Sequence, residues 1–242
     1  IQVVDEAVWK TNASWFVNFD KTPVQGWAAY PANAKHATCA DMMYSIGGIT
    51  YNKNLVDAAH IPTTYRDMLK PYWKGKLLLT DPRTSPAYMG WAAAIEKKYG
   101  IEFLTKLRAQ NPVLVASASP GAQQVAAGAY YANMMAHLSN STALRTAGAP
   151  LGFVVMKDVP TGLPTCAGIP ANAPHPNAAR LFMTWRMTVD AQNAGCAVVE
   201  VGSALKGATN CVKLPILWKP TDLQIMSDKA HQDRILSALG IQ

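Results

Sequence analysis

The loop Thr80 to Tyr88 carries the clearest chemical signal in the sequence. It connects a short apolar run that begins at Lys76 to a segment with helical spacing, and it places Thr84 and Ser85 just before that helix. At a helix start the unpaired N–H groups and the positive end of the dipole favour a carboxylate or a phosphate, and two hydroxyls can add donors. The loop is therefore a candidate anion site. Ordinary N-capping by Thr84 or Ser85 is the alternative explanation, and it needs no ligand.

His137 is a second candidate, because it lies near the C-terminal end of a predicted strand over Tyr130 to Ala136. Ligands of open α/β sheets bind at the C-terminal ends of strands, so this imidazole could contact a solute or act as a base. Tyr130 and Tyr131 are expected in the core or on the sheet, although paired tyrosines can also bind ferric iron. The other histidines stand apart from one another and from acidic clusters, which is typical of surface or hydrogen-bonded residues: His36, His60, His175 and His231.

The common catalytic signatures are missing from the sequence. It has no G-x-S-x-G elbow, no H-E-x-x-H zinc motif, no Walker loop and no G-x-G-x-x-G turn. An α/β enzyme of the periplasm that uses His137 as its base stays open as an alternative function.

Four cysteines are compatible with two disulfides. Cys196 and Cys211 flank a glycine-rich stretch and can close a short loop, which leaves Cys39 to pair with Cys166. Four buried thiols in a cytosolic protein are the alternative, because free cysteine is often buried. No C-x-x-C pair and no histidine at zinc-finger spacing accompany them, so we predict no metal site.

Bulk composition indicates a globular chain with a full core. Half of its 242 residues are apolar, 15% are charged, and no apolar run is long enough for a membrane span. The chain starts without the pattern of an export signal, so we expect such a signal to have been removed or never present. Lysines and arginines exceed acids by 22 to 15, but they are scattered, which favours mild attraction of anions and argues against nucleic acid binding.

Short apolar runs alternate with helical patterns along the chain. Such alternation predicts an α/β fold with a mostly parallel sheet. The paired glycines Gly47 and Gly48 indicate a bulge or a close backbone approach inside a strand. We expect strands at 44–51, 76–80, 130–136 and 151–156, a short capped helix at 65–69, and further helices at 91–98, 103–107, 123–127, 141–147 and 174–193.

Six segments keep the order and spacing of a known family, although none is specific alone: Ile49 to Val56, Ile61 to Leu69, Trp73 to Lys76, Asp81 to Ser85, Gly148 to Leu151 and His175 to Phe182. Through them, the chain from about Tyr30 to Gln192 resembles family 1 extracellular solute-binding proteins of ABC transporters, of the ferric-iron type. The resemblance implies a two-lobed periplasmic-binding-protein fold of class II, with mostly parallel sheets, helices on both faces and a hinge of two crossover strands.

The resemblance also implies a division into lobes. It places the crossovers near Ile46 to Tyr51 and Val154 to Val159. Residues 1–48 and 157–242 then form lobe 1, without the N-terminal portion that family members usually have, and residues 49–156 form lobe 2. Cys39 and Cys166 fall on the same lobe, beside the hinge strands, which makes their pairing reasonable.

The ligand-binding residues that the family resemblance implies are Thr84, Ser85, Ala87, Tyr88, His137, Ser139, Asn140 and Asp158. The iron-binding tyrosine pair of the ferric members would fall on Leu138 and Ser139. The pocket should therefore prefer a small anionic organic solute, a carboxylate or a phosphate ester. Ferric iron held with a synergistic anion is the alternative. The resemblance implies no catalytic residue and no cofactor, and it predicts a monomer in the bacterial periplasm that delivers its solute to an inner-membrane permease.

Overall fold

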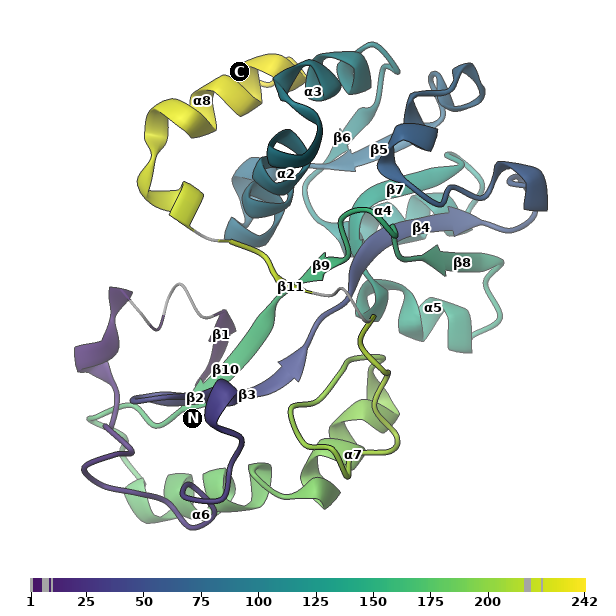
Figure 1. The fold of residues 1–242 in the computed structure, drawn as a ribbon. Coiled ribbons are helices and arrows are strands. Elements are labelled where there is room, and N and C mark those ends of the chain that lie inside the picture. Colours follow the sequence, from purple (N-terminus) through teal and green to yellow (C-terminus); the bar gives the residue numbers. More distant parts are fainter. Residues whose placement is uncertain (1, 6–8, 10, 216–218, 223) are drawn as a thin grey trace. The chain divides into compact units, whose positions relative to one another are not determined.

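The computed structural model describes residues 2–5, 9, 11–215, 219–222 and 224–242 (Figure 1). The chain forms two compact units: unit 1 comprises Ile1–Ser45 and Leu163–Leu214, and unit 2 comprises Ile46–Gly162 and Pro215–Gln242. The chain therefore passes between the units three times. The described residues of the segment Pro215–Gln242 belong to unit 2, whereas the family resemblance predicts them in lobe 1.

Unit 2 is built on a five-stranded sheet with the strand order β6-β5-β7-β4-β8. Strand β5 runs parallel to β6 and β7, while β4 is antiparallel to both β7 and β8. The predicted α/β fold is confirmed, and this sheet is mixed rather than mostly parallel. Its strands are β4 (Gly47–Asn52), β5 (Leu77–Thr80), β6 (Val113–Val115), β7 (Ala132–His137) and β8 (Leu151–Val154).

Helices cover both faces of this sheet because β5 is apolar toward both. Leu77 and Leu79 lie in the main core of unit 2, which also includes side chains of α2, α3 and α8, while Leu78 belongs to the cluster beneath α4. Side chains of a strand alternate between the two faces, so a run of three leucines fills both. These helices (Figure 1) are α2 (Pro86–Tyr99), α3 (Ile101–Arg108), α4 (Ala118–Ala126), α5 (Thr142–Thr146) and α8 (Lys229–Leu239).

The ends of the helical segments follow from local side-chain chemistry. Ser85 caps α2, and Gly100 ends it with a φ of 81°, a conformation that glycine adopts without strain. The predicted capping box is present, with Thr64 and Asp67 at the start of the 3-10 helix η4 (Tyr65–Leu69).

The glycine pair at the start of β4 makes the close approach that the sequence predicts. The register with β7 shifts between Gly48 and Thr50, which is the expected bulge. A Cβ atom on Gly48 would lie 2.3 Å from the carbonyl oxygen of Val154, and one on Gly47 would lie 2.9 Å from that of Thr161. Larger residues therefore do not fit at either position.

Unit 1 contains a four-stranded antiparallel sheet in the order β1-β10-β3-β2. One face packs on α6 through a core that contains Met42, Ala167 and Met183. The strands are β1 (Gln2–Asp5), β2 (Lys35–His36), β3 (Cys39–Tyr44) and β10 (Pro164–Gly168), and the helices are α6 (Pro176–Arg186) and α7 (Val189–Val198).

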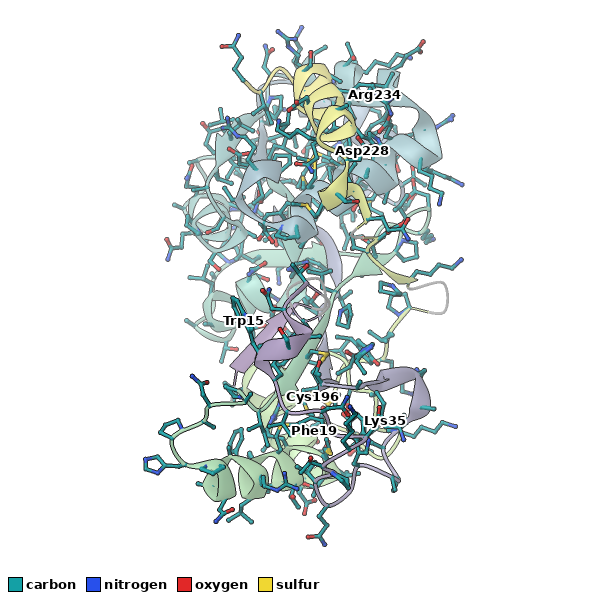
Figure 2. The ribbon with its side chains drawn as sticks, turned by 90° about the vertical axis from the view of Figure 1, so that its left-hand side faces the viewer. Trp15, Phe19, Lys35, Cys196, Asp228 and Arg234 are labelled. Carbon is teal, nitrogen blue, oxygen red and sulfur yellow. A yellow bond between two sulfur atoms is a disulfide. The ribbon has the colours of Figure 1, made fainter. Side chains whose placement is uncertain are left out.

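Both predicted disulfides are present in unit 1. Cys39 pairs with Cys166 across β3 and β10 with a Cα–Cα distance of 5.6 Å, and Cys196 (Figure 2) pairs with Cys211 at 4.9 Å. The cysteines are therefore not free thiols, and the prediction of two bridges is confirmed.

Two predicted elements differ in the structure. The sequence predicts one helix over 174–193, but the chain forms α6 and α7 with a break at Met187 and Thr188. The hydroxyl of Thr188 donates to the carbonyl of Trp185 and accepts from the N–H of Ala191, so it ends one helix and caps the next. The predicted strand over 151–156 ends early, at Val154, and leaves the second predicted crossover without regular structure.

The remaining short elements complete the described chain. No helix in the described part of the chain is both long and apolar enough to cross a membrane. Strands β9 (Thr161–Gly162) and β11 (Lys219–Pro220) pair in parallel, and the 3-10 helices besides η4 are η1 (Ala13–Trp15), η2 (Ala32–Ala34), η3 (Ala58–His60), η5 (Pro71–Trp73), η6 (Pro82–Thr84), η7 (Leu138–Ser141) and η8 (Gln224–Ser227).

A leucine pair tests the burial of β5. Replacing Leu77, which is fully buried, by alanine should lower the free energy of unfolding by about 2–5 kcal/mol, because it leaves a cavity in the core. The matched variant Leu114→Ala, on the neighbouring strand β6 where the side chain is 39% exposed, should cost about 1 kcal/mol or less. Urea unfolding followed by circular dichroism measures both, and equal losses would contradict the burial of Leu77 in the main core of unit 2.

Candidate functional site

All but one of the predicted ligand residues gather at one edge of the unit 2 sheet. Strands β5, β6 and β7 are parallel, with Leu79 opposite both Leu114 and Met134, so their C-terminal ends share an edge. The loop after β5 leads to Thr84, Ser85 and Tyr88, and β7 ends at His137. Open α/β sheets bind ligands at this kind of edge. Seven of the eight predicted residues come from these two loops: Thr84, Ser85, Ala87, Tyr88, His137, Ser139 and Asn140.

The first-turn N–H groups of α2 are already hydrogen-bonded within the helix start. Pro86 has no N–H group, and the Ala87 N–H donates to Ser85 Oγ over 3.2 Å. The N–H groups of Tyr88 and Met89 donate to the Ser85 carbonyl. The capping alternative is therefore the observed arrangement, and no bare amide cradle is left there. Because Ser85 Oγ accepts a hydrogen bond in its cap, its own O–H proton is available to a ligand.

Tyr88 connects the first turn of α2 to its neighbours at the edge. Its ring stacks on His137, with centroids 6.0 Å apart. Burial raises the pKa of the Tyr88 hydroxyl, and a hydrogen bond from the backbone of Ala118, at the start of α4, partly offsets that rise. The hydroxyl is therefore protonated at neutral pH, and its own proton can be donated.

His137 is a neutral imidazole at neutral pH. Burial lowers its pKa to about 4, so it can exchange hydrogen bonds with a solute but carries no positive charge. Its backbone N–H donates to Asn140 Oδ1 over 2.9 Å, which fixes the turn after β7. Asn140 Nδ2 in turn donates to Ser119 Oγ over 3.4 Å, so the turn contacts the start of α4.

The cation in the loop after β5 is paired with an acid of the same loop. Arg83 donates to both carboxylate oxygens of Asp81, at 3.1 Å through Nε and 2.7 Å through Nη2. This pairing lowers the pKa of Asp81. Arg83 also donates to the main-chain carbonyl of Gln242, and Thr84 Oγ1 donates to the Asp81 carbonyl over 2.8 Å. The candidate site in unit 2 therefore offers neutral hydroxyl, amide and imidazole groups.

Asp158 lies away from the other predicted residues. Its carboxylate accepts from the N–H of Tyr65 and from the hydroxyl of Tyr99, which is the last residue of α2. Ser85 stands at the opposite end of this 14-residue helix, about 20 Å away along the helix axis. We therefore leave Asp158 out of the candidate site. Ala87 is buried and its N–H group is capped, so it supports the turn without facing a solute.

The turn at Ser117 to Ser119 belongs to this edge, although it is not among the residues predicted from the sequence. It follows β6 and begins α4, which is the same strand, small polar residues and helix pattern as after β5. The pattern could have indicated it, but β6 is only three residues long and two of its side chains are exposed.

Tyr130 and Tyr131 lie at the other end of β7. The Tyr131 ring contacts Tyr72, with centroids 5.9 Å apart, and the ammonium group of Lys76 lies 4.4 Å from its centre. This tyrosine pair therefore supplies no ligand at the edge that holds His137.

Comparison with known proteins places the chain in a family. The sequence pattern of the bacterial extracellular solute-binding proteins matches residues 19–200. The chain belongs to this family. Curated protein sequences include no match to this solute-binding protein. Family members of this kind serve ABC transporters by delivering a small solute to a membrane permease.

Solved structures share the fold of this solute-binding protein at low sequence identity. The substrate-binding protein of an ABC transporter from Agrobacterium tumefaciens has a TM-score of 0.78 at 14% identity, over 92% of this chain and 75% of that one. AfuA from Actinobacillus pleuropneumoniae, with fructose-6-phosphate bound, has 0.66 at 15%, over 93% and 80%. Iron-bound HitA from Pseudomonas aeruginosa has 0.64 at 16%, over 93% and 77%. The two-lobed periplasmic-binding-protein fold is confirmed.

The lowered pKa of His137 predicts how stability depends on pH. The imidazole titrates at about 4 in the folded protein and near its ordinary 6.5 when unfolded, so between these values only the unfolded chain binds the proton. Stability is therefore complete above the higher value and falls as the pH drops toward the lower one. Across this pH window the free energy of unfolding should change by at most about 3 kcal/mol because of His137. The variant His137→Gln should not show this change. Urea unfolding at a series of pH values measures it, and parallel curves for the two proteins would contradict the prediction.

Proposed function

We propose that this protein captures a small anionic organic solute, a carboxylate or a phosphate ester, and delivers it to the inner-membrane permease of an ABC importer. It works in the bacterial periplasm as a monomer, and it binds without making or breaking covalent bonds. The edge of the unit 2 sheet supplies groups that hold the solute.

The arrangement of hydroxyls at two helix starts is the observation that supports an anion most directly. The positive dipole ends of α2 and α4 lie at the same sheet edge, after β5 and β6. Ser85 accepts a hydrogen bond from the Ala87 N–H group, and Tyr88 lies in the same first turn of α2 beside His137, so each can direct its own O–H proton to a solute. Donors polarised in this way favour a negative oxygen.

The described residues of this edge include no unpaired cation. Such an edge suits a solute that carries further polar groups besides its negative group. His137 is neutral and Arg83 is paired with Asp81, so affinity here comes from several hydrogen bonds rather than from one ion pair. AfuA is described with fructose-6-phosphate bound, and a sugar phosphate is a solute of this kind.

Ferric iron is the competing ligand class, because HitA is described as iron-bound. The positions where the ferric members would carry tyrosines hold Leu138 and Ser139, and Tyr131 lies at the far end of β7. The adjacent tyrosine pair of the ferric members is therefore missing from the described part of this edge, and the remaining tyrosine, Tyr88, keeps its proton because burial raises the pKa of its hydroxyl; both points favour an organic anion over iron.

A ligand screen tests the proposed solute class. Organic acids, sugar phosphates, polyamines and ferric salts are compared by thermal shift, since a ligand selective for the folded protein raises the unfolding midpoint. We expect a concentration-dependent rise with at least one acid or phosphate ester. A rise with ferric salt alone, together with a visible charge-transfer band, would support the iron alternative and contradict the proposal.

Two substitutions test which hydroxyls bind the solute found in that screen. Tyr88→Phe keeps the ring contact with His137 but loses the donor, and Ser139→Ala loses a hydroxyl after β7. Each should weaken binding about tenfold to hundredfold, because each removes a hydrogen bond to a charged group. The matched control is Ser237→Ala, an exposed serine on α8, and it should leave the affinity unchanged. Isothermal titration calorimetry measures all three, and unchanged affinity in both site variants would reject this edge as the binding site.

A further inference from the structure

Four side chains with metal-binding atoms share one face of the unit 1 sheet. Cys39 lies opposite His36 across β2 and β3, and Asp41 follows Cys39 by two residues. Cys166 lies opposite Asp41 across β3 and β10. Residues two apart on a strand, and residues paired across strands, point to the same side of a sheet, so the four side chains converge.

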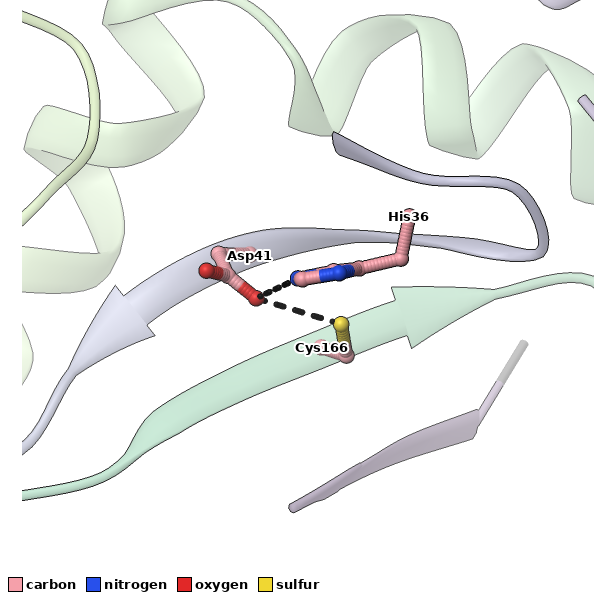
Figure 3. Close-up of side chains that lie close together, drawn as sticks. All are labelled: His36, Asp41 and Cys166. Atoms are coloured by element: carbon pink, nitrogen blue, oxygen red, sulfur yellow. Dashed lines mark hydrogen bonds and ion pairs between the residues drawn. The ribbon is translucent and has the colours of Figure 1, made fainter. Parts of the chain in front are cut away.

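Three of their atoms are already at the spacing of ligands around one ion. His36 Nε2 lies 3.1 Å from Asp41 Oδ1, and Cys166 Sγ lies 3.2 Å from the same oxygen (Figure 3). These three atoms all lie within 4.8 Å of one another. Ligand atoms of a tetrahedral zinc site are separated by about 3.3 to 3.8 Å, given bonds of about 2.0 Å to nitrogen or oxygen and 2.3 Å to sulfur.

The Cys166 sulfur has no proton and no thiolate charge while it is bonded to Cys39. Its contact with Asp41 is therefore not a hydrogen bond, and the oxidised cluster offers a metal two good ligands, His36 and Asp41. Breaking the disulfide supplies two more, since thiolate is a preferred ligand of zinc.

We propose that reduction of the Cys39–Cys166 disulfide converts this cluster into a zinc site with two thiolates, the His36 imidazole and the Asp41 carboxylate. A dithiol supplies the two electrons and two protons, and it becomes a disulfide itself. Both cysteine sulfurs are reduced to thiols. Zinc then binds between the four ligands and releases the two thiol protons to solvent. The His36 Nε2–H group now donates to Asp41, so the imidazole moves its proton to Nδ1 and presents the Nε2 lone pair to zinc.

The surroundings suit a bound cation that stabilises the fold. Cys39 and Cys166 are fully buried in a cluster with Trp9 and Phe16, and Asp41 is 4% exposed. A charge is costly in such a place unless it is paired, and a dication would offset two of the three negative charges of the carboxylate and both thiolates. The His36 side chain is 31% exposed, which gives the ion a route of entry.

The second disulfide provides an internal control within the same unit. Reduction of Cys196 and Cys211 also yields two thiols. Across the part of the chain that the structure describes, no other group of three histidine, cysteine or acidic side chains comes as close together as the cluster around Asp41. Only the Cys39 and Cys166 pair should therefore bind zinc tightly.

In the experiment, zinc is titrated into the full chain after reduction with a phosphine. The phosphine takes oxygen from water and becomes the phosphine oxide. It is used because, unlike a dithiol, it does not compete for zinc. Cys196→Ser/Cys211→Ser keeps the proposed site and should bind one zinc ion when reduced and none when oxidised. Adding His36→Ala or Asp41→Asn to that variant should weaken binding about tenfold or more, measured by competition with a chromophoric chelator. Cobalt should give the thiolate charge-transfer band of a tetrahedral dithiolate site.

Each result decides for or against the site. Zinc binding that is insensitive to both substitutions, or that persists in Cys39→Ser/Cys166→Ser, would overturn it. If reduction unfolds the protein, zinc should restore the circular dichroism spectrum and raise the unfolding midpoint, and failure to do so would also overturn the proposal. The cluster lies wholly in unit 1, so these outcomes are independent of solute binding at the edge of unit 2.

Discussion

Strand β5 can occupy an inner position of the unit 2 sheet because it is apolar toward both faces. Leu77 and Leu79 fill the core beneath α2, α3 and α8, while Leu78 fills the smaller cluster beneath α4. If a strand shifts its register by one residue, each of its side chains moves to the opposite face of the sheet. In β5 such a shift would place Leu78 in the core beneath α2, α3 and α8, and Leu77 and Leu79 beneath α4. This constraint sets the register with β6 and β7, and that register brings the loops after the three strands to one edge.

At that edge, hydroxyls with structural contacts of their own are the ones that we propose for solute binding. Ser85 must cap α2, because the helix would otherwise begin with unsatisfied N–H groups. The Tyr88 ring stacks on His137. Both groups therefore keep a fixed orientation without a solute, and less ordering entropy is lost when one binds.

The sequence predicts the elements whose pattern is local. The run Lys76 to Thr80 is mostly apolar and indicates a buried strand, and Gly100 marks a helix end, because both signals depend on nearby residues. The break at Thr188 is missed because a threonine is compatible with a continuous helix until its two hydrogen bonds are known. The family resemblance places Asp158 in the site, but its partners, Tyr65 and Tyr99, are 93 and 59 residues away. Such long-range contacts leave no local signal.

The division of the chain has a consequence for synthesis. Ile235 and Leu239 of α8 complete a core whose other members, such as Leu104, precede the second segment of unit 1. A ribosome must therefore finish Leu163–Leu214 before the earlier part of unit 2 can bury its apolar surface fully. Until then the nascent chain exposes the face of α3 that α8 later covers, and such surface attracts chaperones or aggregates.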